Sequence, residues 1–138
     1  MIAIIRIAGM VNVNEDIKNT LDRLRLRRKY ACVLIKETPE TKGMIKKVRN
    51  HVAYGNIDDK TLEELVEKRG QLIDKRKKMD VKKVIKEIIS DKTMTNLEIK
   101  PFFRLHPPRG GINSKQHFPK GVLGDHKENI NELIRRML

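Results

Sequence analysis

Residues 2–8, Ile2-Ala-Ile-Ile-Arg-Ile-Ala8, set the class of the fold. A short run of β-branched residues bounded by Gly9 is typical of a mostly buried strand. Residues 30–35, Tyr-Ala-Cys-Val-Leu-Ile, form a second continuous apolar run and predict a central or covered strand. Residues 51–57 predict a third, weaker strand. Residues 1–57 are therefore predicted to contain three short strands.

Helical patterns lie between these strands. Ile17, Leu21 and Leu24 recur at intervals of four and three, and Asn14 or Asn12 can cap the helix, which predicts a helix over about residues 15–25. After Thr38-Pro39-Glu40, the residues Met44, Ile45 and Val48 predict a short second helix. The order strand, helix, strand, helix, strand predicts an α+β core over 1–57, a two-layer unit with both helices on one face of the sheet.

Three further regions follow the core. Residues 58–98 predict a helical extension, with one helix starting at Asp58 or Asp59 and stopped by Gly70, and another starting at Asp80. Residues 99–124 hold four of the five prolines, four of the eight glycines and all three phenylalanines, which predicts a basic, extended arm or long loop. Residues 125–138 predict a C-terminal helix that packs on the core.

Composition excludes several classes of protein. No apolar run approaches the roughly 20 residues of a membrane span, and Arg6 interrupts the apolar start, which argues against a signal peptide. The single cysteine, Cys32, cannot form an intrachain disulfide, and neither it nor the four histidines show metal-finger spacing. We expect a soluble cytoplasmic protein with no membrane partner and no metal.

The net charge of +13 is concentrated in two blocks. Residues 17–57 carry eleven Lys or Arg against three Asp or Glu, and residues 99–124 carry five against none. Residues 58–98 are nearly balanced, eleven against ten, and their interleaved charges fit solvated helix faces. Blocks of uncompensated basic residues neutralise phosphates, so the pattern indicates a nucleic-acid partner.

The stretch 102–111, Phe-Phe-Arg-Leu-His-Pro-Pro-Arg-Gly-Gly, suits RNA in particular. Aromatic side chains among basic ones can stack on unpaired bases and bind phosphates. Gly110 and Gly111 allow a close approach of the backbone to a phosphate. Since neighbouring residues of an extended chain point to opposite sides, one of Phe102 and Phe103 is expected in the core.

Catalytic interpretations are weak. His106 and His117 with Lys115 could act as a general acid and base on RNA, but two histidines eleven residues apart in a loop carry no geometric constraint. Paired carboxylates at residues 58–59 and 63–64 are explained by a helix start rather than by magnesium. The sequence has no phosphate-loop lysine motif, no dinucleotide-binding glycine pattern and no nucleophile elbow.

Four separated motifs resemble one known family over essentially the whole chain. They are the opening residues 6–14, residues 38–48 (Thr-Pro-Glu-Thr-Lys-Gly-Met-Ile-Lys-Lys-Val) with 54–58 after them, residues 103–111, and the tail 130–137. Together they resemble the large-subunit ribosomal protein family L-thirty. The archaeal form, which is similar to the eukaryotic protein L-seven, matches best.

This resemblance implies a small antiparallel sheet of order three, one, two with both helices on one face, a somewhat ferredoxin-like core. Bacterial relatives look like residues 1–57 alone. It also implies a noncatalytic protein that binds and stabilises folded large-subunit ribosomal RNA (23S type), beside neighbouring ribosomal proteins, with no cofactor and no small-molecule substrate. Whether 5S rRNA is contacted stays open, and a free-standing RNA-binding regulator or a histidine-dependent ribonuclease remains the alternative.

Residues 38–49 and 104–111 match family motifs, so the resemblance places RNA contact on their basic residues, while the other candidates rest on charge and position. The candidates for RNA binding are Arg27, Arg28, Lys29, Lys42, Lys46, Lys47, Arg49, Arg104, His106, Arg109, Gly110, Lys115, His117 and Lys120.

Overall fold

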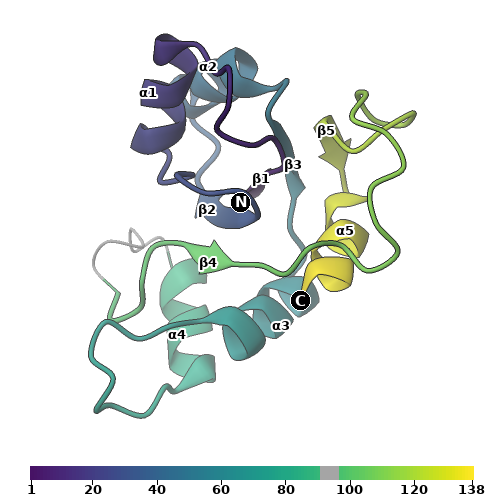
Figure 1. The fold of residues 1–138 in the computed structure, drawn as a ribbon. Helices are drawn as coiled ribbons and strands as arrows, with labels where there is room; N and C mark the ends of the chain where they lie inside the picture. The colour runs from purple at the N-terminus through teal and green to yellow at the C-terminus, as the bar shows by residue number, and fades with distance from the viewer. Residues whose placement is uncertain (91–96) are drawn as a thin grey trace.

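The computed structural model describes residues 1–90 and 97–138, and Figure 1 shows their arrangement. The elements, in chain order, are β1 (Ile2–Arg6), α1 (Glu15–Arg23), β2 (Ala31–Ile35), α2 (Pro39–Val48), β3 (Val52–Asn56), α3 (Asp59–Arg69), α4 (Val81–Ile89), β4 (Phe103–Arg104), β5 (Gly124–Lys127) and α5 (Ile130–Met137).

The strands form one sheet of order β4-β2-β1-β3-β5. β1 lies in the centre and pairs antiparallel with β2, where Ile2 is opposite Ile35, and with β3, where Arg6 is opposite Val52. The order three, one, two predicted for the core is therefore confirmed. The chain after residue 98 adds both outer strands: β4 pairs antiparallel with β2, and β5 pairs parallel with β3.

Side chains alternate across the sheet and build two cores. On one face, Ile4 and Val33 pack with α1 and α2 through residues such as Leu21 and Ile45, so both early helices lie on one face as predicted. On the other face, Ile5 and its neighbours pack with α3, α4 and α5. Figure 1 shows α1 and α2 above the sheet and the later helices below it. The extension thus adds a third layer to the two-layer core.

Local signals account for where the helices start. The side chain of Asn14 accepts a hydrogen bond from the backbone N–H of Asp16 at the start of α1. Thr38 and Thr41 form a capping box at the start of α2, and Asp58 caps α3. Asp80 caps α4. These caps agree with the helix starts that the sequence predicts.

Residues 99–124 lie along the body of the protein. The core that packs against α3, α4 and α5 buries four residues of this segment: Ile99, Phe103, Leu105 and Leu123. Phe102 points to the other side of the chain and packs onto the core beneath α1 and α2. The expectation that one of the two adjacent phenylalanines is buried is confirmed. Five buried hydrophobic residues and the edge strand β4 secure this segment to the sheet, and edge strand β5 begins at its last residue.

Candidate nucleic-acid interface

The pairing of β2 with β4 brings the two basic blocks of the sequence together at one edge of the sheet. Ala31 is opposite Arg104, and the backbone N–H of Leu105 donates to Tyr30 O at 3.0 Å. Lys29 lies with its ammonium 5.0 Å from the centre of the Tyr30 ring. We call this set the β4-edge group; its members are Arg27, Arg28, Lys29, Arg104 and His106, all exposed.

A buried arginine fixes the loop that carries the first half of this group. Arg6 is only 2% exposed, and its guanidinium donates to Leu26 O at 2.7 Å, Gly9 O at 3.0 Å and Ala8 O at 3.1 Å. Burial lowers the pKa of this guanidinium, with the nearby Asp22 carboxylate opposing the shift. The buried Leu26 anchors the chain just before Arg27, so the basic loop is held in one shape.

The turn at Arg109–Gly111 is held by the last helix. The backbone N–H of Arg109 donates to Arg136 O at 3.0 Å, and the Arg136 guanidinium donates to Arg109 O at 3.0 Å and to Gly111 O at 2.8 Å. Gly110 and Gly111 have φ of 82° and 75°, a conformation that favours glycine. An added Cβ at Gly111 would meet nothing within 4 Å, so the backbone is open to an outside group such as a phosphate.

Helix α2 presents the next cationic face. Ile45 and Val48 are buried, whereas the opposite side exposes its basic side chains. Lys42 is paired with Glu37 at 2.7 Å, which lowers the pKa of that carboxyl, and Lys47 lies 3.9 Å from Asp16. Lys46 and Arg49 show no ion pair among the described residues. Two of the four cations are therefore partly compensated.

The loop before β5 lies beside the end of α2. His117 Nε2 is 2.8 Å from Asn50 Oδ1, a contact that joins residues 67 positions apart. Lys42 and Lys46 also line a groove of about 310 Å³ between α2 and β5, together with Lys127 and Tyr54. Burial raises the pKa of the Tyr54 hydroxyl. The candidate residues on α2, at its C-terminal end and in the loop before β5 are together called the β5-edge group. Its members are Lys42, Lys46, Lys47, Arg49, Lys115, His117 and Lys120.

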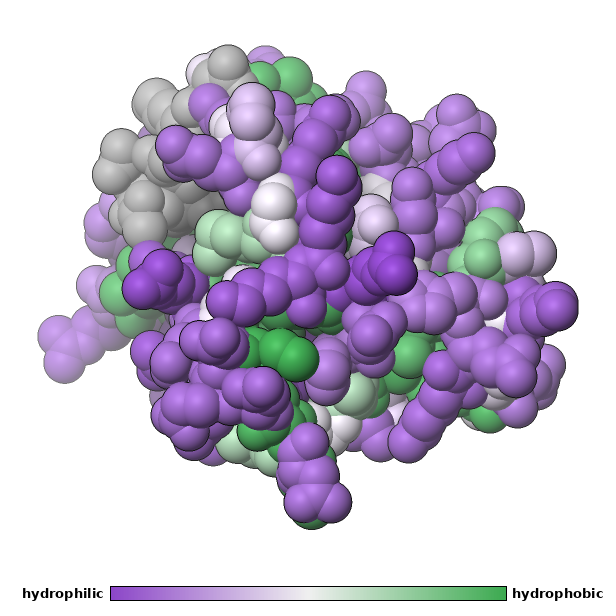
Figure 2. All heavy atoms as spheres, turned by 90° about the horizontal axis from the view of Figure 1, so that it is seen from above, coloured by the Kyte–Doolittle hydropathy of each residue, from purple (hydrophilic) through white to green (hydrophobic). Residues whose placement is uncertain are grey.

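The candidates therefore occupy three places: the β4-edge group, the turn at Arg109 and Gly110, and the β5-edge group at the far edge of the sheet. Figure 2 shows one face of the molecule, on which hydrophilic side chains predominate and the hydrophobic ones form small separate patches.

The two histidines considered for RNA cleavage belong to different parts of the fold. His117 is bonded to the end of α2, while the backbone N–H of His106 donates to Met137 O at 2.8 Å at the end of α5. The histidine that the fold buries is His126, whose Nε2 lies 2.6 Å from Val122 O. Its environment lowers its pKa, mainly by burial.

The sequence analysis overlooked a group of basic residues, because it summed their charge with that of nearby acidic residues over a long segment. Residues 58–98 balance overall, but the acids gather on α3, whereas residues 71–90 carry seven basic residues against three acids. The seven are Lys75, Arg76, Lys77, Lys78, Lys82, Lys83 and Lys86, and all are exposed. A shorter counting window shows this excess. Lys127, in the groove beside α2, has no such signal, because residues 125–138 sum to zero charge.

Neither a membrane segment nor a metal cluster is found in the described part of the chain. No helix within residues 1–90 or 97–138 has the length and apolarity needed to cross a bilayer. Over the same residues, no three His, Cys, Asp or Glu side chains are placed to share a metal ion. Cys32 is buried, which raises the pKa of its thiol to about 12 and leaves it a small core residue.

Comparison with known proteins identifies similar chains. The family model described as "Ribosomal protein L30p/L7e" matches residues 2–52. A protein of Archaeoglobus fulgidus named "Large ribosomal subunit protein uL30" is 42% identical, with 99% of each chain covered. Proteins of the same name from Nanoarchaeum equitans and Pyrobaculum aerophilum are 40% and 41% identical, and each comparison covers 99% of this chain and 97% or 93% of the relative.

Proposed function

The chain belongs to the ribosomal L30p/L7e family, and from this premise we propose that it is a structural component of the large ribosomal subunit that binds ribosomal RNA. The observation that carries the proposal is identity of about 40% with large-subunit proteins over 99% of the chain. Its place of action is then the ribosome, in the cytoplasm, and its role is noncatalytic.

The distribution of charge supports an electrostatic mode of binding. The β4-edge group, the turn at Arg109 and the β5-edge group present exposed cations, and residues 99–124 contain no acid. Each Lys or Arg that neutralises a phosphate releases condensed counterions, which supplies affinity without reading the base sequence. Membership of this family implies that the RNA is large-subunit RNA of the 23S type, whose folded helices would approach one another around these surfaces.

Fixed loops support binding at defined positions. Arg6 holds the loop before Arg27, and Arg136 holds the turn at Arg109. A cation on a loop that is already ordered loses less conformational entropy when it meets a phosphate than one on a mobile tail. We infer that the protein locks the relative positions of RNA segments that meet it at different edges of the sheet.

The first experiment is sedimentation. A lysate of cells that contain this protein is run through a sucrose gradient at moderate and at high salt, and each fraction is probed for the chain. Cosedimentation with the large subunit at moderate salt supports the proposal. Recovery at the top of the gradient under both conditions refutes it and favours a free RNA-binding regulator. Probing whether 5S rRNA crosslinks to the chain in the same fractions decides that separate question.

A second experiment tests the site residues. The affinity for large-subunit rRNA is measured at several salt concentrations for the wild type, Arg109→Ala and Lys60→Ala. Arg109→Ala is expected to weaken binding and to lower the slope of log affinity against log salt by about one unit, the loss of about one phosphate contact. Lys60 is exposed on α3 among acidic residues, so Lys60→Ala is expected to change neither. Equal effects of the two substitutions would refute the assignment.

A further inference from the structure

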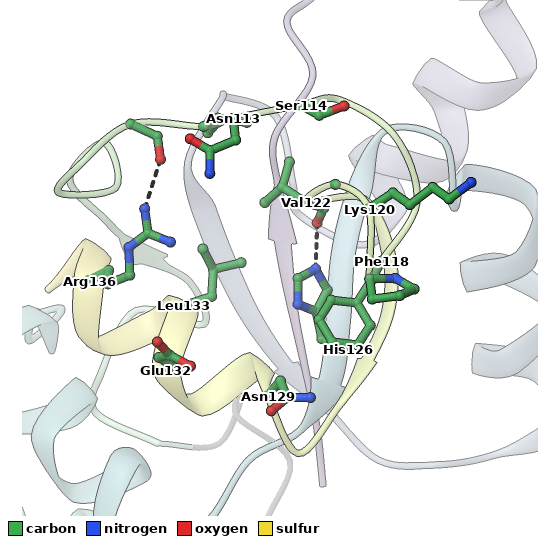
Figure 3. Close-up of a pocket in the computed structure, with 14 residues that line it drawn as sticks. Asn113, Ser114, Phe118, Lys120, Val122, His126, Asn129, Glu132, Leu133 and Arg136 are labelled. Atoms are coloured by element: carbon green, nitrogen blue, oxygen red, sulfur yellow. Dashed lines mark hydrogen bonds between the residues drawn. The ribbon is translucent and has the colours of Figure 1, made fainter.

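A pocket lies beneath the loop that precedes β5. Residues 111–122 arch over α5 and enclose a cavity of about 300 Å³ (Figure 3). Figure 3 shows Val122 and Leu133 as apolar walls of the pocket and Lys120 directed away from it. The volume is at the lower end of the roughly 300–1,000 Å³ found for small-molecule pockets, so it suits one planar group rather than a length of chain.

Hydrogen bonds hold the loop in its arched shape. The backbone N–H of Val122 donates to Ser114 O at 3.1 Å, and that of Leu123 donates to Gln116 O at 3.0 Å. At the other end, Arg136 donates to Gly111 O at 2.8 Å. The loop is thus tied both to itself and to α5, which gives the pocket a defined shape.

One wall of the pocket is an aromatic platform. The Phe118 ring is 36% exposed, and its centre lies 4.6 Å from the centre of the His126 ring at an angle of 35°. His126, which also lines the pocket, is buried and bonded to Val122 O, so its ring contact holds Phe118 in a fixed position. A partly exposed, rigidly backed aromatic ring is a favourable surface for stacking an unpaired base.

Polar groups line the remaining part of the pocket. Figure 3 shows the amide of Asn113 directed into the space between the loop and α5, with Asn129 and Glu132 at the helix side. Amides can both donate to and accept from the edges of bases, and a carboxylate can accept from them. The cavity therefore combines a stacking surface with hydrogen-bonding groups.

We propose that this pocket receives one unpaired base of the bound RNA, which stacks on Phe118 and presents its edge to Asn113. The inference rests on the proposed function. An RNA occupant is favoured over a protein side chain because residues 111–122, which form the arch, carry two basic residues, Lys115 and Lys120, and no acid. The pocket also lies next to the turn at Arg109, which the same Arg136 side chain holds, so a strand bound at this turn can place its base inside.

The test compares binding of protein-free large-subunit rRNA by the wild type, Phe118→Leu and Phe118→Trp. Loss of a stacked base costs about 1–3 kcal/mol, so Phe118→Leu is expected to weaken binding by about 5- to 150-fold. The slope against salt is expected to stay unchanged, because no phosphate contact is removed. Phe118→Trp keeps an aromatic surface and is expected to retain affinity within a few-fold. Wild-type affinity of Phe118→Leu would overturn the proposal.

Chemical probing of the RNA identifies the base and guards against a folding defect. In complexes with wild-type protein, one unpaired nucleotide is expected to be protected from dimethyl sulfate or a carbodiimide at its pairing edge. It is expected to become reactive with Phe118→Leu and with Asn113→Ala, an exposed position whose change leaves the Phe118 platform in place. If Phe118→Leu fails to fold, unchanged protection with folded Asn113→Ala overturns the proposal. Failure of the wild type to bind rRNA would instead refute the proposed function.

Discussion

Replacing Arg6 by Met is expected to destabilise the protein strongly, because this buried guanidinium ties two segments, residues 8–9 and the chain at Leu26, to the end of β1. It donates hydrogen bonds of 2.7, 3.0 and 3.1 Å to the carbonyl oxygens of Leu26, Gly9 and Ala8. Methionine matches the length of the stem but donates to none of them. Arg6→Met leaves those oxygens to find other partners.

The magnitude follows from where each oxygen lies. Hydrogen bonds to charged groups contribute about 1.5–3 kcal/mol each, so three give at least about 4.5 kcal/mol before compensation. The bond to Leu26 O is buried, while those to Ala8 O and Gly9 O are partly exposed and can be replaced by water. Relief of the cost of burying a charge offsets a further part. We expect a loss of about 3 kcal/mol in the free energy of unfolding.

The assay is urea unfolding followed by circular dichroism, with Arg28→Met as the matched control. Arg28 is exposed in the same basic loop, so its replacement is expected to change stability by less than about 0.5 kcal/mol. Arg6→Met is expected to lower the Tm by roughly 10 °C as well. A change of less than about 1 kcal/mol for Arg6→Met would refute the argument that this guanidinium fixes the loops.

Three further predictions concern glycine, histidine and a helix cap. Gly55→Ala is expected to lower the free energy of unfolding by more than about 2 kcal/mol, since the added Cβ would overlap Lys127 O and the side chain of Ile130. In contrast, the Cβ added by Gly43→Ala in α2 meets nothing, so this variant is expected to be about 0.5–1 kcal/mol more stable. Thermal unfolding of both variants checks the contrast. His126 has a lowered pKa in the folded state, so the unfolded state binds the proton more readily. The stability that comes from burying the neutral imidazole is therefore fully present above about pH 6.5, and it is lost as the pH falls through the folded pKa. Urea titrations from pH 7.5 to 5 are expected to show a smaller fall for His126→Asn than for the wild type, and an equal fall in both would contradict the assignment. Thr38→Ala removes one half of the capping box and is expected to lower the free energy of unfolding by about 1 kcal/mol, as measured by equilibrium unfolding. The control Pro39→Ala, at the first position of the helix, is expected to lower it by no more than about 0.3 kcal/mol.

Local sequence signals sufficed for most of the core. Caps such as Asn14, Thr38 and Asp58 act through hydrogen bonds within four residues, so the helix starts can be predicted without knowing the rest of the fold. The first two strands of 1–57 follow for a similar reason, because short apolar runs rich in β-branched residues favour buried strands, whereas the third strand, Val52–Asn56, has a weaker pattern. The basic character of the surface likewise follows from counting charges.

The site depends on contacts that no local pattern contains. The pairing of Ala31 with Arg104 and the bond from His117 to Asn50 join residues 73 and 67 positions apart, and only the folded sheet makes them neighbours. The excess of basic residues in 71–90 was hidden because an average over 58–98 adds the acidic residues of α3 to it. The supporting role of Arg6 was equally invisible, since an arginine inside an apolar run carries no sign of which carbonyl groups it will reach.

The amino-acid sequence by itself therefore determined the family, the strand and helix order of residues 1–57 and the cationic nature of the surface, because these depend on residue type and short-range spacing. Only the tertiary structure decided that β4 and β5 extend the sheet at its two edges and that the cations divide among three places. It also decided that the loop before β5 encloses a pocket lined by Phe118 and His126. Each of these depends on long-range packing, in which the free energy is shared among residues that are far apart along the chain.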